Sequence, residues 1–574
     1  MDAKKQAAIA AIEAKKDVIC HVADTIWANP ELSLQEVKSA ALYCQVLEQE
    51  GFQVEKGVCS IPTAFAASFG SGRPHIGILA EYDALSGLSQ KAGSLTQEEI
   101  VPSGCGHGCG HNLLGAGALA AALGVKAYLE TAGVSGTVTL YGCPGEEGGA
   151  AKAFMARDGL WRQLDAALTW HPEDTNEVIT GSSNSCIQVQ YTFHGIASHA
   201  AGAPDRGRSA LDAVELMNIG VQFLREHMSD KARIHYAITD AGGRSPNVVQ
   251  PRSTVLYMVR SNHVSEAVQL QKRVDKIADG AALMTETSYD RKFIDGLADT
   301  VPNHVLEALL HKNFEELGVP GHTAEELAFA DSLSKTYEGA GGVPGIGSKY
   351  DPAYAKAAKA LQNGIGHAMN DFLLPLYSGD AFRPGSTDVG DVSWECPTAQ
   401  ISVASWPNGC PGHSWQNVSC DGTDIGRKAA VHAAALEAKL AAEAIDVTIP
   451  GDEIEIGHQH PMNQVLQQIK DTFVGMGYEV YEAPEVELAD YNFTRLNIEE
   501  GHPSRDRSDT FYFTDDDSVL LRTQTSPMQI RYMEKHKPPL CMLAPGRVFR
   551  KDEADATHSP MFHQIEGLVV AENI

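Results

Sequence analysis

Two cysteines and two histidines fall within nine positions in the stretch GCGHGCGHN, residues 104–112. Four ligands from so short a segment would be cramped around one ion, because structural zinc sites usually join two separated pairs. Cys105 and Cys109 also lack the C-x-x-C spacing of thioredoxin-like redox pairs. Cys109 and His111 are two positions apart, and in an extended segment such positions point the same way. We therefore expect Cys109 and His111 to reach one point. Cys105 is expected to be structural, and His107 either supports the site or packs in the loop. The competing interpretation is that Cys109 is a buried free cysteine.

Further candidate ligands stand at the ends of predicted strands. Glu146 and Glu147 follow the apolar run TVTLYG within GCPGEEGGA. His171 comes directly after the run DAALTW, and His413 lies in the turn PGHSWQ. Adjacent carboxylates leave the backbone in different directions, so one could bind metal while the other handles protons. An exposed acidic turn and two structural histidines are the alternatives for these motifs taken singly.

Together these side chains offer thiolate, imidazole and carboxylate donors. All come from strand ends or the loops after them, where open α/β sheets place their sites. Such a mixture can hold two divalent ions close together and lower the pKa of a water between them. The candidate ligands for such a site are Cys109, His111, Glu147, His171 and His413.

The composition limits the class of protein. At about 150 residues per domain, the 574 residues suffice for roughly three or four domains. The formal net charge of −29 disfavours nucleic-acid binding by the whole chain, and an anionic substrate would need a local basic pocket. The odd number of cysteines, eleven, favours a reducing compartment over a disulfide framework. The N-terminus lacks the apolar core of a signal peptide, and no run of about 20 apolar residues predicts a membrane span. A cytoplasmic location without membrane contact is therefore expected.

The elements that must position these ligands belong to an α/β domain. Residues 1–185 alternate apolar strands, such as HIGILA, with helices, such as GAGALAAALGVKAYLE. This alternation is typical of a sheet with helices on both faces. The pattern resumes over residues 304–440, so the domain is predicted to be discontinuous.

Residues 186–303 carry a different pattern. A strand, an amphipathic helix, two strands, a second helix and a last strand follow one another in the order βαββαβ, which matches a ferredoxin-like α+β unit. We predict an inserted domain here. The composition changes again at about residue 445, and the Ala-rich run HAAALEAKLAAEA, residues 432–444, is predicted to be one helix that crosses the join.

Motifs spread over residues 1 to about 440 resemble peptidase family M20 amidohydrolases, in their order along the chain. The similarity is greatest to the branch that has a cysteine ligand and includes the aminobenzoyl-glutamate hydrolases. The matching stretches are NPELS (29–33), EYDALSGLSQ (81–90), GHGCGHNLLG (106–115), EEGGA (146–150), DAALTWHPE (165–173), GRSALDAVELM (207–217), HYAIT (235–239), SPNVVQ (245–250), GAALMTET (280–287), STDVGDVSW (386–394) and HSWQ (413–416).

The resemblance implies a cofactor of two divalent metal ions, zinc or manganese. Cys109 would bridge or bind both ions, in the place that an aspartate holds in other M20 branches. Two complete metal sites would be formed with His111, Glu147, His171 and His413.

The resemblance also implies roles in catalysis and substrate binding. Glu146 would be the general base and then the acid that protonates the leaving amine, and Asp83 would orient a ligand or tune its basicity. The inserted unit would be the lid and dimerisation domain. There His199 would stabilise the oxyanion in the partner subunit's site, and Asn247 and Arg260 would contact the substrate carboxylate. The implied assembly is a homodimer, or a heterodimer with a related subunit.

Residues from about 445 to 574 resemble the first half of the catalytic core of another family, the α subunit of phenylalanyl-tRNA synthetase. This would be a partial class II synthetase fragment with an antiparallel α+β sheet. The matching stretches are DVTIPG (446–451), NFTRLNIEEGHPSRDRSDTFYF (492–513), LLRTQTSPMQIRYM (520–533) and PGRVFRKDEADATHSPMFHQIEGLVV (545–570).

In that family's terms Arg550 would contact the ATP α-phosphate. Gln564 and Glu566 would hold the phenylalanine amino group, with Ser526 nearby. The printed sequence departs from the pattern, because it contains no third class II motif and Gln524 stands where many members have histidine. Half a sheet would also leave open edges and uncovered apolar surface. We therefore expect no aminoacylation, and we do not expect a synthetase β subunit to bind here.

The sequence thus favours a metal-dependent amidohydrolase acting on an acyl- or aryl-amino acid, with p-aminobenzoyl-glutamate or a related N-acyl amino acid or dipeptide as substrate. Two alternatives remain. The first is ATP, phenylalanine or tRNA binding of the synthetase α-subunit type, and the second is a non-catalytic binding module that docks through its tail.

Overall fold

The structure, a computed structural model, describes residues 3–442 except 378 and 380, and residues 461–572 except 556 and 557. The chain divides into two units, Met1–Ile449 and Pro450–Ile574. The predicted helix across residues 432–444 is α13 up to Ala441. Its continuation through the join lies outside the described residues.

A seven-stranded mixed sheet forms the centre of the first unit, in the order β1-β2-β4-β3-β5-β13-β6. The four inner strands β4, β3, β5 and β13 run parallel, whereas β1, β2 and β6 add antiparallel edges. The predicted α/β sheet is therefore present, with antiparallel additions that the sequence pattern did not indicate. The strands are β1 Gln53–Lys56, β2 Phe65–Ser71, β3 His75–Ala80, β4 Gly136–Gly142, β5 Ala166–Glu173, β6 Glu177–Ile179 and β13 Thr398–Ala404.

Helices cover both faces of this sheet, because successive strand residues point to opposite sides. Ile78, Leu140 and Leu168 join the core under α4 and α13, while their neighbours Leu79 and Tyr141 join a second cluster with residues of α5 and α11. The α-helices of this unit outside the inserted domain are α1 Ala3–Ala14, α2 Lys16–Ala28, α3 Val37–Gln49, α4 His111–Ala132, α5 Ala151–Arg157, α8 His304–Leu317, α9 Ala324–Leu333, α10 Pro352–Asn363, α11 Val389–Ser393, α12 Trp415–Asp421 and α13 Asp424–Ala441.

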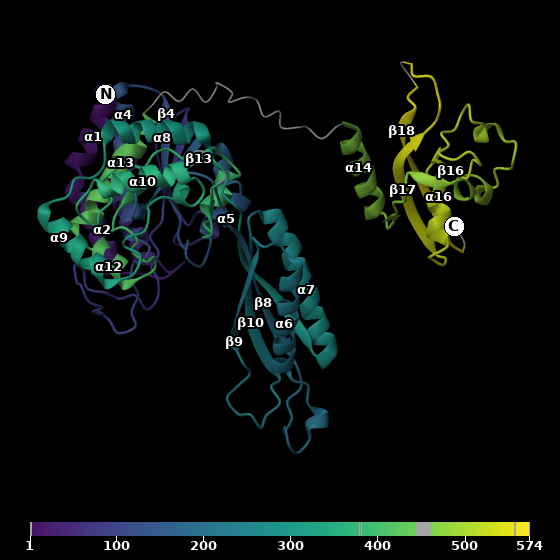
Figure 1. Ribbon diagram of the computed structural model, residues 1–574, viewed down its shortest axis with the longest axis horizontal. Helices are drawn as coiled ribbons and strands as arrows, with labels where there is room; N and C mark the ends of the chain where they lie inside the picture. Colours follow the sequence, from purple (N-terminus) through teal and green to yellow (C-terminus); the bar gives the residue numbers. More distant parts are fainter. Residues whose placement is uncertain (1–2, 378, 380, 443–460, 556–557, 573–574) are drawn as a thin grey trace. The chain divides into compact units, whose positions relative to one another are not determined.

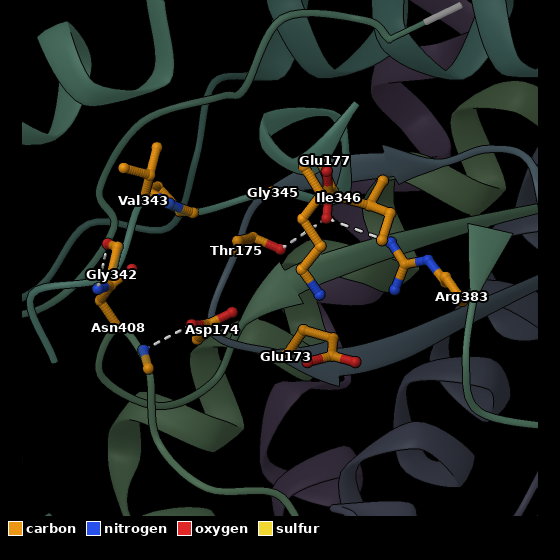
Figure 2. A pocket seen from close by; sticks show the side chains of 13 residues that line it. Glu173, Asp174, Thr175, Glu177, Gly342, Val343, Gly345, Ile346, Arg383 and Asn408 are labelled. Carbon is orange, nitrogen blue, oxygen red and sulfur yellow. Dashed lines mark hydrogen bonds and ion pairs between the residues drawn. The ribbon is translucent and has the colours of Figure 1, made fainter. Parts of the chain in front are cut away.

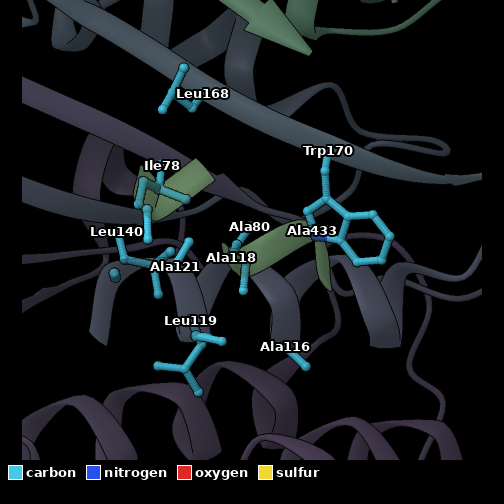
Figure 3. Packing of buried hydrophobic residues seen from close by; sticks show 14 of the residues in the cluster. Ile78, Ala80, Ala116, Ala118, Leu119, Ala121, Leu140, Leu168, Trp170 and Ala433 are labelled. Atoms are coloured by element: carbon cyan, nitrogen blue, oxygen red, sulfur yellow. The ribbon is translucent and has the colours of Figure 1, made fainter. Parts of the chain in front are cut away.

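Helix α4 lies in the middle of the core, and Figure 3 shows Ala116, Ala118 and Leu119 on it together with Trp170 of the sheet. Its small residues allow this close packing. A Cβ added at Gly117 would lie 2.5 Å from the Trp170 indole nitrogen. Among the described residues α4 is the single helix long and apolar enough to cross a membrane, yet 83% of its apolar window is buried inside the protein. Such burial is typical of a core helix.

A four-stranded antiparallel sheet with two helices on one face is inserted after β6 and the short strand β7, Ser182–Ser183. Figure 1 shows α6 and α7 side by side along this sheet, whose strand order is β11-β8-β10-β9. Val189, Val214 and Val274 belong to its separate hydrophobic core. The elements follow the predicted order βαββαβ, as β8 Ser185–His194, α6 Ala210–Leu224, β9 Arg233–Asp240, β10 Arg252–Ser261, α7 Val264–Thr285 and β11 Ser288–Leu297.

The second unit contains a three-stranded sheet, β14-β17-β18, and a two-stranded sheet, β15-β16. Met528, Tyr532 and Met542 form part of its small core. Strand β18 lies at an edge of its sheet, and Met561 and Val569 on it are about two-fifths exposed, at 40% and 41%. Its elements are α14 Pro461–Gly475, β14 Glu479–Val480, β15 Val486–Leu488, α15 Ala489–Asn492, β16 Val519–Leu521, α16 Pro527–Met533, β17 Leu540–Phe549 and β18 Met561–Val570.

Candidate active site

The carboxyl ends of four neighbouring parallel strands meet at one edge of the large sheet. Asp83 follows β3, the pair Glu146 and Glu147 follows β4, His171 lies in β5 itself, and the loop after β13 carries His413. The predicted position of His171 directly after a strand is slightly wrong, because β5 continues to Glu173. This edge is where α/β sheets place their sites, and the residues that bear chemistry converge there.

Cys109 and His111 reach this edge by a route different from the predicted one. The segment is not extended, since Gly110 has φ 73° and ψ 20° and His111 is the first residue of α4. A left-handed turn at the start of the helix brings the two side chains together. A Cβ at Gly110 would lie 2.9 Å from Pro172 side-chain atoms, so glycine is required for both conformation and space.

Two sets of three donor atoms share the Cys109 sulfur. Cys109, His111 and His171 form one set, and Cys109, Glu147 and His413 form the other. The donor atoms within each set lie within 4.8 Å of one another. All five ligands predicted from the sequence are therefore brought together.

His111 is held from one side so that its other nitrogen faces the site. Its Nδ1 lies 2.9 Å from Asp83 Oδ1, and Asp83 Oδ2 accepts hydrogen bonds from Ser33 Oγ at 2.8 Å and from the Glu147 backbone N–H at 3.0 Å. Burial would raise the pKa of Asp83, but the hydrogen bond with His111 and its charge outweigh burial and lower that pKa to about 2. Asp83 is therefore an ionised carboxylate that fixes the imidazole ring.

His413 contacts Glu147 across the second set of donors, with 3.3 Å between Nε2 and Oε1. This contact raises the pKa of His413. Burial opposes the ionised form of Glu147, yet His413 lowers the pKa of that carboxyl group. The His413 backbone has φ 54°, a left-handed conformation that is uncommon outside glycine and is often found at functional sites.

Glu146 belongs to a third group of close donors, with Glu81 and His111. Burial, followed by the charges of Glu81 and Asp388, raises the pKa of Glu146 well above its usual range. A carboxyl group with a raised pKa can accept a proton near neutral pH and return it, which is what a general base and acid requires. Glu146 thus differs electrostatically from its neighbour Glu147.

Three charged residues that the sequence analysis did not single out support this wall of the site. Lys152 Nζ lies 2.6 Å from Glu81 Oε1 and 2.5 Å from Asp388 Oδ1, and all three side chains are almost fully buried. Glu81 Oε2 in turn lies 3.2 Å from His111 Nε2. Glu81 and Asp388 lie inside motifs that match the family, but neither motif indicates that a lysine joins them.

A cleft with a volume of about 540 Å³ opens beside the donor groups. Its floor includes Cys109, Glu146 and His413, and the inserted domain contributes Gln188 and Arg260 to its wall. A cleft of this size accommodates a small molecule. Both domains of the first unit therefore face any bound substrate.

Two buried donor atoms without a hydrogen-bond partner among the described residues indicate that this set of side chains fits divalent metal ions. Within the described part of the chain, His111 Nε2 and Glu147 Oε1 are buried and have ion-pair contacts but no well-formed hydrogen bond. Burial also raises the pKa of the Cys109 thiol well above its usual range, so a thiolate there needs a cation beside it. Thiolate, imidazole and carboxylate are ligands that zinc and similar ions accept.

The comparisons with known proteins agree with this geometry. The profile of peptidase family M20/M25/M40 matches residues 77–485. A subunit of the p-aminobenzoyl-glutamate hydrolase of Escherichia coli K12 is 42% identical over 469 residues, covering 80% of this chain and 94% of that protein. The chain belongs to peptidase family M20.

A solved structure has a fold similar to that of the first unit. The putative aminohydrolase from methicillin-resistant Staphylococcus aureus aligns with a TM-score of 0.52 at 16% identity, covering 76% of this chain and 99% of that chain. At this identity the similarity concerns the fold alone. The predicted fold class, an M20 catalytic domain with an inserted α+β domain, is therefore confirmed.

The C-terminal segment matches a second family. The profile of the class II core domain (F) of tRNA synthetases covers residues 444–574. The phenylalanine–tRNA ligase α subunit of Alkaliphilus oremlandii is 56% identical over 147 residues, which is 26% of this chain and 43% of that protein. The chain thus spans less than half the length of this relative.

Of the M20-type residues predicted on the lid, the structure brings one into the cleft of its own chain. Arg260 lies on β10 and lines the cleft, with its Nε 3.1 Å from Met258 Sδ. His199 and Asn247 are exposed and lie in neighbouring loops, joined by a hydrogen bond from the Ala200 N–H to the Asn247 carbonyl oxygen. Neither is among the described residues that line this cleft.

The other two members of the CGHGCGH run stand apart from the donor groups. His107 is buried, with Nε2 3.2 Å from the Ile26 carbonyl oxygen, and burial lowers its pKa to about 4. Cys105 lines a separate apolar cavity beside Trp27. Both positions agree with the structural roles expected for them.

The synthetase-like residues form a connected polar cluster within the second unit. Glu566 accepts hydrogen bonds from Ser526 Oγ at 2.7 Å, from Gln529 Nε2 at 2.7 Å and from Gln564 Nε2 at 3.0 Å. Arg550 makes a different contact, because its Nε donates a hydrogen bond to the Thr523 carbonyl oxygen at 3.2 Å. The predicted amino-acid-binding residues Ser526, Gln564 and Glu566 are thus brought together, whereas Arg550 is not part of their cluster.

Proposed function

We propose that this chain hydrolyses the amide bond between an aryl or acyl group and an amino acid, with p-aminobenzoyl-glutamate as its substrate. The two donor sets that share Cys109 carry this proposal, because they suit a pair of divalent ions at the floor of a cleft. The substrate named for the relative from E. coli supports the choice of substrate.

The proposed cofactor is a pair of zinc or manganese ions. One would be held by Cys109, His111 and His171, and the other by Cys109, Glu147 and His413. When bound, such ions polarise a carbonyl group and lower the pKa of water. The thiolate ligand favours zinc, but affinity order does not decide which metal an enzyme uses.

The side chains of the protein supply the proton transfers and the orientation. Glu146 takes a proton from the attacking water and gives it to the departing amine nitrogen. Asp83 keeps the His111 ring in one orientation. Arg260 in the cleft contacts the substrate carboxylate, and we assign Asn247, which like His199 does not line this cleft, to the same carboxylate in the partner's site.

The exposed position of His199 supports a role in a neighbouring subunit. We assign it to the oxyanion formed on the substrate in the partner's site, where an imidazole N–H would stabilise developing negative charge. The partner is a second copy of the chain or a related subunit, joined through the lid. All eleven cysteines are free, which supports a reducing compartment such as the cytoplasm.

A second candidate function concerns residues 444–574 alone. The cluster of Ser526, Gln564 and Glu566 supports recognition of an amino-acid ammonium group. We propose that residues 444–574 do not catalyse aminoacylation by themselves, because this stretch contains no third class II motif to contribute the second ATP-binding arginine. Phenylalanine-dependent exchange of pyrophosphate into ATP is the assay, and we expect none above background. Exchange that saturates with phenylalanine would support the synthetase alternative.

The test of the amidohydrolase separates catalysis from metal binding. The purified chain is loaded with zinc or manganese, and release of p-aminobenzoate from p-aminobenzoyl-glutamate is measured beside the metal content. Glu146→Ala should abolish turnover and keep the bound metal, whereas Glu130→Gln, an exposed change at the end of α4, should alter neither. Full activity in the Glu146 variant, or no release by the metal-loaded chain, would contradict the proposal.

A further inference from the structure

A second, smaller cavity adjoins the cleft, and none of its lining residues comes from the inserted domain. It has a volume of about 220 Å³ and is shown in Figure 2. Glu173, Ile346, Lys349 and Arg383 line both this cavity and the cleft. A group that extends from a substrate in the cleft can therefore meet these four side chains.

Arg383 is held in place with most of its hydrogen-bonding capacity unused. Figure 2 shows its side chain directed toward Glu177, and the distance from Nη2 to Glu177 Oε1 is 3.3 Å. Glu177 also accepts a hydrogen bond from Thr175 Oγ1 at 3.2 Å, so the contact is fixed on that side. In the described residues Arg383 Nε has no acceptor. A guanidinium has five N–H donors, and this arrangement leaves the others for a ligand.

Lys349 contributes a second cation at the same place. It ends the short turn Ile346–Lys349 and is exposed, and within the described residues no carboxylate pairs with it. A cation without a described carboxylate partner is notable in a chain with a net charge of −29. At the junction of the two cavities, Lys349 and the remaining N–H donors of Arg383 can attract an anionic group.

The carboxylates of the small cavity differ in how many hydrogen bonds and ion pairs they make with the protein. Asp174 accepts a hydrogen bond from the Gly409 N–H at 2.6 Å, and burial raises its pKa to about 7. Glu177 is occupied by Thr175 and Arg383. Glu173 is the remaining acid, and its carboxylate lies 3.9 Å from His171 Nδ1. Among the described residues, Lys349 is therefore the cation at this junction without a carboxylate partner, while Arg383 is paired with Glu177 and keeps its other N–H donors.

We propose that Lys349 and Arg383 form the subsite for the side-chain carboxylate of the amino acid that is released, which makes the enzyme selective for N-acyl derivatives of acidic amino acids. This inference rests on the proposed amidohydrolase function. Such a substrate carries two carboxylates, and the lid residues Arg260 and Asn247 are assigned to only one. Arginine and carboxylate match geometrically, and charge-assisted bonds of this kind are the strong ones.

The neutral analogue is the discriminating substrate. p-Aminobenzoyl-glutamine has nearly the shape of p-aminobenzoyl-glutamate but lacks the negative charge of the side chain, so a subsite made by Lys349 and Arg383 should bind it more weakly. In the wild-type chain we expect kcat/KM to favour the glutamate derivative by about 10- to 100-fold, mainly through KM.

Two variants test the assigned residues. Lys349→Gln changes an exposed side chain without a described partner, so the fold should be kept. Arg383→Gln is combined with Glu177→Gln, because Glu177 is nearly buried and would otherwise lose its cation. Each variant should lower kcat/KM for the glutamate derivative about tenfold or more and leave that for the glutamine derivative within about twofold. Lys349→Glu should shift the preference toward an N-acyl-lysine.

Binding provides a readout that does not depend on turnover. In the Glu146→Gln background, calorimetry on the metal-loaded chain compares the Kd of the two substrates with and without the Lys349 and Arg383 changes. Loss of glutamate-specific affinity supports the subsite. Equal losses for both substrates, no loss, or a wild-type preference for acyl-lysine would overturn it. Hydrolysis of both substrates without preference would refute this subsite alone, whereas hydrolysis of neither would refute the proposed function.

Discussion

Cys109 Sγ and His171 Nε2 lie 3.5 Å apart, although 62 residues separate them in the chain. The ring N–H at His171 Nδ1 donates to the Pro172 carbonyl oxygen at 2.7 Å, so the lone pair of Nε2 faces the thiol. Because Cys109 also belongs to the set with Glu147 and His413, this contact joins the two halves of the candidate metal centre. Gly110, the residue after Cys109, packs closely against the Pro172 side chain.

Removing the shared sulfur should affect both halves at once. We expect Cys109→Ser to bind both divalent ions more weakly, because a hydroxyl is a much poorer ligand than a thiolate for zinc-like metals. Metal content after dialysis, measured by mass spectrometry, gives the stoichiometry. Cys105→Ser, four residues away and outside both donor sets, is the matched control and should retain the wild-type content. Full retention of either ion by the Cys109 variant would argue against a shared ligand.

Asp83 should make the stability of the metal-free protein depend on pH in acid. Its folded pKa of about 2 is below the ordinary value of 3.8. A lowered folded pKa stabilises the protein above the ordinary value, and this contribution is lost as the pH falls from about 4 to about 2. The difference in unfolding free energy between wild type and Asp83→Asn should therefore shrink by about 2 kcal/mol over that window.

Urea unfolding at a series of pH values measures this difference. Asp371→Asn is the control for the loss of an aspartate–histidine contact nearer the surface. Asp371 lies 2.8 Å from His322 Nδ1, and 19% of its side chain is exposed. A pH-independent difference for Asp83→Asn would show that its carboxylate is not preferentially stabilised in the folded state.

Much of the site could be predicted because Glu147, His171 and His413 lie at or after the carboxyl ends of strands. Glu147 and His171 are predicted from the apolar runs before them, which indicate buried strands, and His413 from the turn PGHSWQ; parallel strands bring their carboxyl ends together. The Cys109–His111 spacing predicted convergence correctly but for the wrong reason. The two side chains converge because Gly110 adopts a left-handed conformation at the start of α4, and not because the segment is extended.

The supporting charges could not be predicted in the same way. Lys152 and Asp388 are 236 residues apart, and no spacing rule connects a helix residue to so distant a carboxylate. Their pairing depends on the inner packing of α5 against α11, which only the fold determines. The antiparallel edges of the sheet escaped prediction for a similar reason, since alternation marks a strand but not its direction.

Gly110 should be intolerant of a side chain. Gly110→Ala would strain a left-handed backbone and force a Cβ to within 2.9 Å of Pro172, so we expect a loss of about 2 kcal/mol or more of stability. Gly280→Ala is the matched control, because Gly280 lies inside α7 with nothing within 4 Å of an added Cβ. It should instead stabilise the protein by about 0.5–1 kcal/mol. Thermal unfolding of both variants measures whether the two substitutions change the stability in opposite directions. Equal effects would contradict the role given to Gly110.

Lys152 should contribute strongly to the stability of the protein, although it is not a ligand of the proposed metal ions. Burial opposes its charged form, but Asp388 and Glu81 raise its pKa well above the usual range, so it is a cation between two buried carboxylates. Lys152→Met would leave both acids uncompensated, and we expect a loss of about 3–5 kcal/mol.

The same argument predicts a rescue. The triple variant Lys152→Met, Glu81→Gln, Asp388→Asn removes all three charges and should recover most of the lost stability, because neutral groups carry no comparable desolvation cost. Lys56→Met removes an ion pair with Glu48 in which both side chains are more than half exposed, and its melting temperature should stay that of the wild type. Denaturant unfolding distinguishes the outcomes. If Lys152→Met is as stable as wild type, or if the triple variant is no better than the single one, the charge compensation inferred from these distances is wrong.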